Sequence, residues 1–228
     1  MVGGTRYTFD VAGLYNGVFV MRDRQTGSVW THYDGAVLEG PLADQDIQLR
    51  MLPMVQTTWD QWVGAYPESV VLDWYAKYAE QYRWMGGSGP GPLGPEFVRT
   101  VLNWDDRLPQ RELVLGVALA DERRAYVLSE FASELAVQED ELAGVTLAIF
   151  LDPRADFGLA FAARLDEQVL QFEVVDGAIT DATGSVWDLR GRALSGPLAG
   201  QQLEFVTSFM TQWYGWAAYN PDTTIYGR

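Results

Sequence analysis

The sequence predicts a mainly β fold built from two duplicated halves, each ending in one short helix that carries tryptophans. The first observation is a pentapeptide, Thr-Gly-Ser-Val-Trp, which occurs at residues 26–30 and again at 183–187. The second is that three further blocks follow each copy in the same order: Gly-Pro-Leu-Ala at 40–43 and 196–199, Trp-x-x-Trp at 59–62 and 213–216, and a proline, an acid and a hydroxyl residue at 67–69 and 221–223. Repetition in a fixed order indicates one duplicated unit.

The third observation is the alternation of apolar and polar residues between turn signals, which is typical of antiparallel strands. We therefore predict antiparallel sheets or barrel-like halves related by a pseudo-twofold axis. The predicted divisions are a first repeat over 1–74, a connecting insert over 75–142 and a second repeat over 143–228. A chain of 228 residues can bury a sizeable core, so we expect one compact domain.

In the first repeat, residues 7–11 alternate and predict a strand. Asn16-Gly17 is a two-residue hairpin signal, which makes 18–21 the returning strand. Thr57 is predicted to cap a short helix, with Asp60 as its capping-box partner. The remaining predicted strands of this repeat are 29–30, 36–38, 47–52 and 70–72.

The insert contains a loop rich in glycine and proline at 86–95, a strand, turn and strand within 111–128, and an acidic turn at 138–141. The second repeat begins with the continuous apolar run 145–151, which is typical of a central strand. It continues with strands at 159–164 and 169–174, a helix capped by Thr211, and a strand at 224–226.

The two repeats differ at their starts. Phe172 of the second repeat is preceded by two predicted strands, whereas almost nothing precedes Phe9 of the first. We therefore expect the first repeat to be incomplete at its N-terminal side, with the natural gene starting upstream. Because an unpaired strand edge is a liability, residues 7–11 should lie beside a vacant edge or a strand borrowed from the insert or a second chain.

Composition excludes several classes of protein. The net charge of −15 argues against nucleic-acid binding and against anionic membrane surfaces. No apolar run is long enough to span a bilayer, so we predict no membrane insertion. Lys77 is the only lysine, and the acidic surface fits either a saline habitat or a GC-rich genome that favours arginine codons.

Several phrases resemble the domain-of-unknown-function family 3179 of bacteria and archaea: 11–16, 23–30, 106–109, 114–117 and 216–223. The resemblance implies little about activity, but many members look exported or lipid-anchored, so an extracytoplasmic location is expected. Members often carry a Tyr-Cys-Pro phrase where this chain has Leu151-Asp152-Pro153. Any role of a thiol in relatives is therefore absent here.

The candidate ligand-binding residues are Asp23, Arg24, Ser28, His32 and Asp152. A Ser-His-Asp triad would need His32, the only histidine, for which a surface position is favoured. Ser28, with its counterpart in the second pentapeptide, either binds a ligand or caps a turn, and the cap is favoured. Asp23-Arg24 could hold a carboxylate or a sugar, and the second repeat has Thr180-Asp181 at this place.

Asp152 belongs to an acidic stretch that could serve glycoside hydrolysis or bind calcium, although a solvated run of charge is favoured. One histidine and no cysteine make a zinc site impossible, so no metal, cofactor or catalytic residue is predicted. We expect the tryptophans to be structural and buried, with a sugar-stacking platform as the alternative. They are Trp30, Trp59, Trp62, Trp187, Trp213 and Trp216.

The sequence therefore favours a non-catalytic binding or scaffold domain whose ligand, a small molecule or a protein, stays open. The alternative is a metal-independent hydrolase or carbohydrate-active enzyme that uses Asp or Glu side chains in a cleft between the repeats. A pocket lined by two close carboxylates would favour the enzyme.

Overall fold

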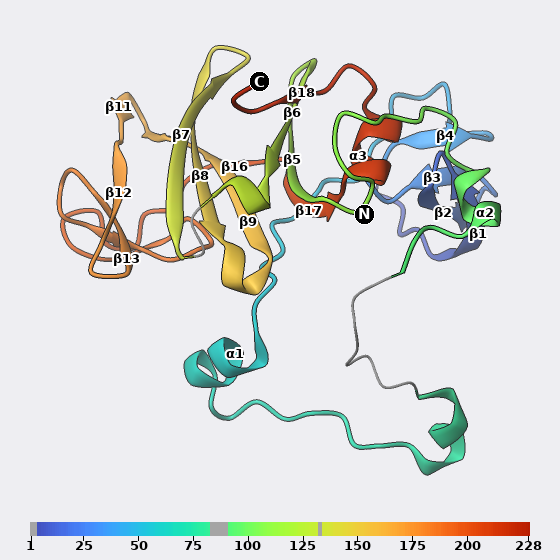
Figure 1. The fold of residues 1–228 in the computed structure, drawn as a ribbon, viewed down its shortest axis with the longest axis horizontal. Helices are drawn as coiled ribbons and strands as arrows, with labels where there is room; N and C mark the ends of the chain where they lie inside the picture. The colour runs from blue at the N-terminus through green and yellow to red at the C-terminus, as the bar shows by residue number, and fades with distance from the viewer. Residues whose placement is uncertain (1–3, 83–90, 132–133) are drawn as a thin grey trace.

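The computed structural model describes residues 4–82, 91–131 and 134–228, and the fold is mainly β with a few short helices, as predicted (Figure 1). The first strands are β1 (Phe9–Tyr15), β2 (Val18–Asp23), β3 (Val29–Thr31) and β4 (Val37–Glu39). The central strands are β5 (Leu113–Leu119), β6 (Glu122–Val127), β7 (Ala136–Leu142), β8 (Val145–Asp152) and β9 (Phe157–Ala162). The later strands are β10 (Arg164–Leu165), β11 (Gln168–Val169), β12 (Phe172–Val175), β13 (Ala178–Asp181), β14 (Val186–Trp187), β15 (Ala193–Ser195), β16 (Phe205–Val206), β17 (Ser208–Gln212) and β18 (Thr224–Ile225).

The helices are α1 (Trp59–Ala65), α2 (Pro95–Val98) and α3 (Trp213–Tyr219), with 3₁₀ turns η1 (Ala76–Gln81), η2 (Leu128–Glu130) and η3 (Pro153–Ala155). The strands form four sheets of four strands, in the orders β1-β2-β3-β4, β12-β13-β14-β15, β16-β9-β8-β7 and β17-β5-β6-β18, and one pair, β10-β11. No sheet of the described residues closes into a barrel, so the barrel-like alternative is wrong.

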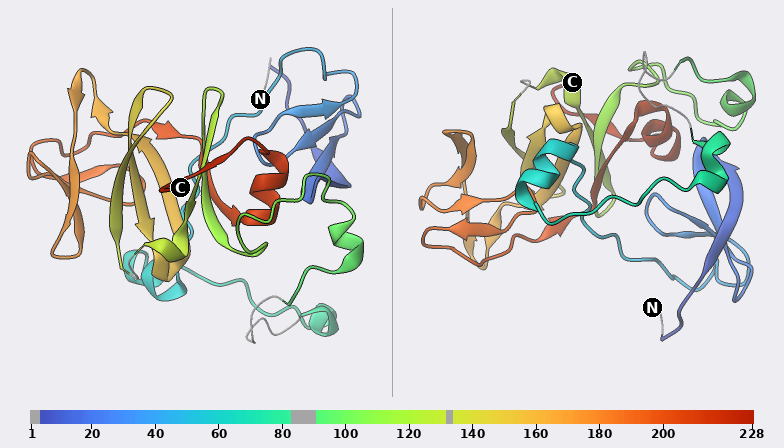
Figure 2. Two further views of the ribbon diagram at one scale, coloured as in Figure 1. Left: turned by 45° about the horizontal axis from the view of Figure 1, so that its top comes forward. Right: turned by 90° about the horizontal axis from the view of Figure 1, so that it is seen from below.

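Two of the four-stranded sheets, β1–β4 and β12–β15, are meanders of consecutive strands, and they lie at opposite ends of the molecule (Figures 1 and 2). The hairpin between β1 and β2 turns at Asn16-Gly17 as predicted, and both residues have positive φ, 50° and 74°, as this tight turn requires. Within the described chain β1 pairs only with β2, so the expected vacant edge is present. β12 is also an edge strand, and the vacancy therefore does not distinguish the repeats.

One of three clusters of buried hydrophobic side chains lies between the two central sheets. Strands β8 and β9 pair with each other and pack against β5 and β6, burying Leu115, Tyr126, Ile149 and Leu151 completely. The sequence placed β8 and β9 directly before β12 as strands of the second repeat, but they belong to a different sheet from β12. The acidic segment 138–141, predicted to be a turn, is part of β7 and pairs with β8 along its whole length. Its alternation places Leu142 in the core while Glu139 and Glu141 face outward.

Helices α1 and α3 share their local structure but not their burial. The indole of Trp62 donates to Ser69 Oγ and that of Trp216 donates to Thr223 Oγ1, both at 2.8 Å. Trp213 and Trp216 are 0% and 1% exposed, whereas Trp59 and Trp62 are 52% and 43% exposed. The prediction of burial is thus right for α3 and wrong for α1. The physical reason is that β5 covers α3, while no strand of the described chain covers α1 in this way (Figure 1).

Several boundaries differ from those predicted. Thr58, not Thr57, caps α1, and its capping-box partner is Gln61. Gln212 precedes α3 without a side-chain cap, because the hydroxyl of Thr211 bonds to Tyr33 at 2.6 Å instead. Residues 47–52 and 70–72 form no strand, although Gln48 bridges Ala36.

The predicted glycine and proline loop at 86–95 lies outside the described residues up to Pro90. Residues 91–94 are irregular, and Pro95 opens α2, where its fixed φ suits the first helical position.

Candidate functional site

The two pentapeptides form matching hydrogen-bond networks around buried tryptophans. The indole of Trp30 donates to Asp23 Oδ2 and that of Trp187 donates to Asp181 Oδ2, both at 2.8 Å. Phe9 and Phe172 pack edge-on against these indoles, with ring centroids 5.7 and 5.6 Å apart. Asp23 is therefore matched by Asp181. The sequence comparison of the two repeats had paired Asp23 with Thr180, one residue earlier. These matched contacts are what a duplication predicts, and the duplication itself stays a prediction.

Two of the five candidate ligand-binding residues take part in this network. Asp23 is 1% exposed and also accepts hydrogen bonds from the backbone and side chain of Thr26. Burial raises the pKa of Asp23, but the hydrogen bonds from Trp30 and Thr26 outweigh it and leave the pKa below its ordinary value. Ser28 is fully buried and accepts from the backbone N–H of Leu42 at 3.2 Å. These contacts hold the turn together.

The other three candidates lie in separate places. Arg24 is exposed and pairs with Asp10. His32 is exposed, with Nδ1 2.7 Å from the carbonyl oxygen of Phe19. Asp152 is 3% exposed and accepts from Gln61 Nε2 at 2.9 Å, which ties α1 to the end of β8. The structure therefore does not gather the five residues into one site.

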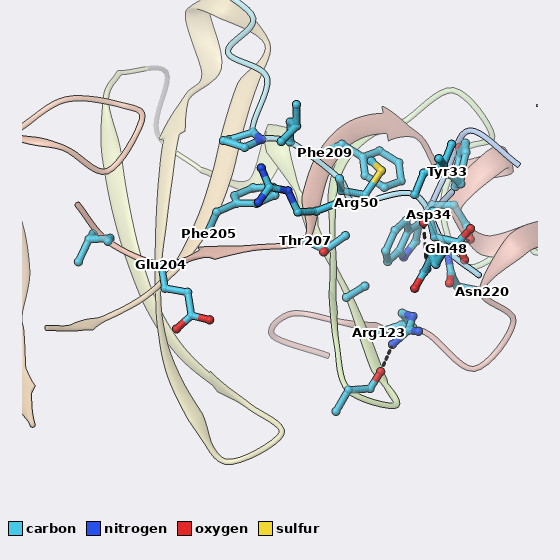
Figure 3. A pocket seen from close by; sticks show the side chains of 18 of the residues that line it. Tyr33, Asp34, Gln48, Arg50, Arg123, Glu204, Phe205, Thr207, Phe209 and Asn220 are labelled. Carbon is cyan, nitrogen blue, oxygen red and sulfur yellow. Dashed lines mark hydrogen bonds between the residues drawn. The ribbon is translucent and has the colours of Figure 1, made fainter. Parts of the chain in front are cut away.

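A cleft of about 960 Å³ lies between the two meanders, with β17 and the β5–β6 hairpin as its floor (Figure 3). Its two sides are built from matching loops. Leu49 N–H donates to the carbonyl of Gly35 at 2.9 Å, and Leu203 N–H donates to the carbonyl of Gly191 at 2.8 Å. Both glycines have positive φ, 74° and 73°, so each loop turns sharply at its glycine. The side chain that precedes each glycine lines the cleft.

The matching loops carry opposite charges. Asp34 precedes Gly35 where Arg190 precedes Gly191, and Arg50 follows Leu49 where Glu204 follows Leu203. Two further arginines, 123 and 192, also line the cleft. The lining therefore has four arginines against two carboxylates, in a chain with a net charge of −15. This concentrates positive charge where a ligand could enter.

The arginines are engaged to different degrees. Arg190 pairs with Asp188 at 3.3 Å, and Arg123 Nη1 donates to the carbonyl of Ala120 at 2.7 Å. Within the described chain, the guanidinium groups of Arg50 and Arg192 make no hydrogen bond and no ion pair. Unpartnered guanidinium groups are five-donor forks that suit carboxylate or phosphate oxygens.

Aromatic side chains form the wall next to these charges. Phe209 packs edge-on against Tyr33, with ring centroids 4.9 Å apart, and Tyr219 donates to Asp34 at 3.2 Å. Burial raises the pKa of both tyrosines, and the carboxylate of Asp34 adds to the rise at Tyr219. Both phenols therefore stay protonated across the physiological range.

Sequence reasoning offered a cleft between the repeats only for the hydrolase alternative, and it named none of the charged residues that line the cleft, because they belong to no motif. A signal was available in the sequence. A glycine follows each pentapeptide, at 35 and at 191, and in both places the residue before this glycine is charged, Asp34 and Arg190. In residues 4–82, 91–131 and 134–228, no three His, Cys, Asp or Glu side chains gather as a metal site would require. Nor does any helix of that part have the length and apolar character needed to cross a membrane.

Comparison with curated proteins and with solved structures found no match. A family model described as "Protein of unknown function (DUF3179)" matches residues 1–223, nearly the whole chain. The chain therefore belongs to the DUF3179 family of proteins of unknown function.

Proposed function

We propose that this chain is a non-catalytic binding domain whose site is the cleft between the two meanders. The observation that carries the proposal is the cleft itself, about 960 Å³ in volume, whose lining combines aromatic side chains with charged and amide side chains (Figure 3). Ligand sites in proteins have this size and this mixture of apolar lining and placed polar groups.

The alternative is a hydrolase that uses carboxylates in the same cleft. Glycoside hydrolysis needs two carboxyl groups on either side of the bond, about 5–10 Å apart. The two carboxylates of the lining are Asp34, which accepts from Tyr219, and Glu204, and Figure 3 shows them at opposite ends of the cleft. This arrangement favours binding over hydrolysis. Turnover of a chromogenic glycoside or ester that is lost in both Asp34→Asn and Glu204→Gln would support the enzyme instead.

A blocked cleft tests the proposal. Thr207 lines the cleft floor, and Thr207→Trp should fill much of the space. Compounds that raise the melting temperature of the wild type in a screen of sugars, acids and amines should lose their effect on this variant. Thr146→Trp is the matched control, because Thr146 is exposed on β8 away from the cleft. Stabilisation that survives in Thr207→Trp would place the ligand elsewhere and contradict the proposal.

We also propose that the protein acts outside the cytoplasm, a proposal supported only by the resemblance of its motifs to a family whose members look exported. Fractionation of cells that express the natural gene provides the test. Recovery of the protein only with cytoplasmic markers would contradict the location and leave the binding proposal intact.

A further inference from the structure

The charges of the cleft are distributed unequally, and this narrows the class of ligand. We propose that the ligand of the cleft is an acidic saccharide, a hydroxyl-rich small molecule with a single carboxylate. This inference rests on the proposed function of the cleft as a binding site. The carboxylate lies at the end formed by Arg190 and Arg192, and the hydroxyl groups lie at the end formed by Asp34. Three independent features of the lining support this assignment.

The first feature is the end of the cleft that belongs to the second repeat. Arg190 and Arg192 flank Gly191, where the first repeat has Asp34 and Ala36 around Gly35. Arg192 pairs through its backbone with Gln202, two residues before Glu204. Figure 3 shows Glu204 at the end of the cleft far from Asp34. The free guanidinium of Arg192 provides a fork for a carboxylate, whereas Arg190 beside it is paired with Asp188.

The second feature is the opposite end, which presents the Asp34 carboxylate together with two side-chain amides. Gln48 donates its amide N–H to the carbonyl of Asp34 at 2.9 Å, and Asn220 donates to the carbonyl of Trp216 at 3.1 Å. Each amide keeps a second N–H and its oxygen, so beside the Asp34 carboxylate this end offers a ligand both donors and acceptors. A ligand must supply a donor to Asp34 and must avoid a second negative charge. Hydroxyl groups meet both conditions.

An ammonium group would also donate to Asp34, as in a dipeptide. The cleft as a whole opposes it, because four arginines face two carboxylates. A neutral donor avoids this repulsion, and so a sugar hydroxyl is favoured over an amine.

The third feature is the aromatic wall. Phe205 and Phe209 are half-buried, so each ring keeps an accessible part in the cleft (Figure 3). The apolar face of a pyranose ring packs well on such a surface, while its hydroxyls point to the polar end. The volume of about 960 Å³ accommodates a disaccharide.

Titration calorimetry at low salt tests the inference with cellobiouronic acid, which has one carboxylate, its neutral counterpart cellobiose, and a dipeptide. We expect the wild type to bind the acid at least about tenfold more tightly than either other probe. The variant R190A/R192A should lose this advantage, and R164A should keep it, because Arg164 is exposed on β10 outside the cleft. Circular dichroism checks that each variant is folded.

Equal binding of the acid by R190A/R192A and the wild type would overturn the inference, as would equal binding of cellobiose, tighter binding of the dipeptide, or no binding of the acid at all. These failures are distinct from failure of the cleft proposal. If another compound binds the wild type but not Thr207→Trp, the cleft remains the site and only the ligand class is wrong. If Thr207→Trp still binds whatever the wild type binds, the cleft proposal fails.

Discussion

Replacing Trp216 with alanine is expected to lower the free energy of unfolding by about 3–5 kcal/mol, whereas Trp62→Ala should lower it by less than about 1 kcal/mol. The two indoles make the same hydrogen bond, to Thr223 and Ser69. They differ in burial, because Trp216 is 1% exposed and Trp62 is 43% exposed. The comparison therefore measures what burial adds to the same local hydrogen bond.

The contact that buries Trp216 is unusually close. A Cβ atom added at Gly116 on β5 would lie 2.2 Å from Cε3 of the indole, so only glycine fits opposite the ring. Urea denaturation of both variants gives the two free energies, and equal slopes show that both unfold in the same manner. A loss for Trp62→Ala as large as that for Trp216→Ala would mean that α1 is covered in solution.

The second large effect is expected at the buried aspartates. Asp23→Ala and Asp181→Ala should each cost about 2–4 kcal/mol, because each leaves an indole N–H and backbone donors without an acceptor. Asp181 accepts from Trp187 at 2.8 Å and from the backbone N–H of Thr183 at 2.7 Å. Asp121→Ala, at an exposed position, is the matched control. A large loss at one aspartate and none at the other would show that the two networks are not equivalent.

Acid adds a further test at Asp23. Its pKa is lower in the folded state than its ordinary value of 3.8, so the group stabilises the fold fully above that value. This contribution is lost as the pH falls through the lowered pKa. Stability curves measured between neutral pH and pH 2 should therefore fall less steeply for Asp23→Ala than for the wild type. An unchanged slope at low pH would show that Asp23 does not supply this contribution.

Local patterns predicted much of the fold, because the relevant interactions lie close together in the chain. The Asn16-Gly17 hairpin, the buried run of β8 and the turn at each pentapeptide all follow from neighbouring residues. The strand predicted at 70–72 failed for the opposite reason. Val70 and Leu72 have high strand propensity, but they are 91% and 94% exposed with no partner strand among the described residues. Propensity without a pairing partner does not form a sheet.

The burial of the helices shows the same limit. Sequence spacing places Trp59 and Trp62 on one helical face as it does Trp213 and Trp216, and it says nothing of what covers that face. The segment around α1 is uncovered as a whole. Of the twenty exposed large hydrophobic side chains in the described residues, twelve lie between Leu52 and Tyr82. The arginines of the cleft were missed on the same grounds, because they come from segments that are distant in sequence and meet only in the fold.

The first meander is attached to the rest of the molecule through its own contacts. Gly17 N–H donates to the carbonyl of Thr100 at 3.1 Å, the side chain of Asn16 bonds to Leu102 and Ala218, and Tyr33 bonds to Thr211. Residues 66–82 are mostly exposed, so we expect this connection not to be needed to hold these elements together. A protease that cuts this connection should therefore leave two fragments that stay associated, and the same two fragments expressed separately should reassemble into one folded molecule.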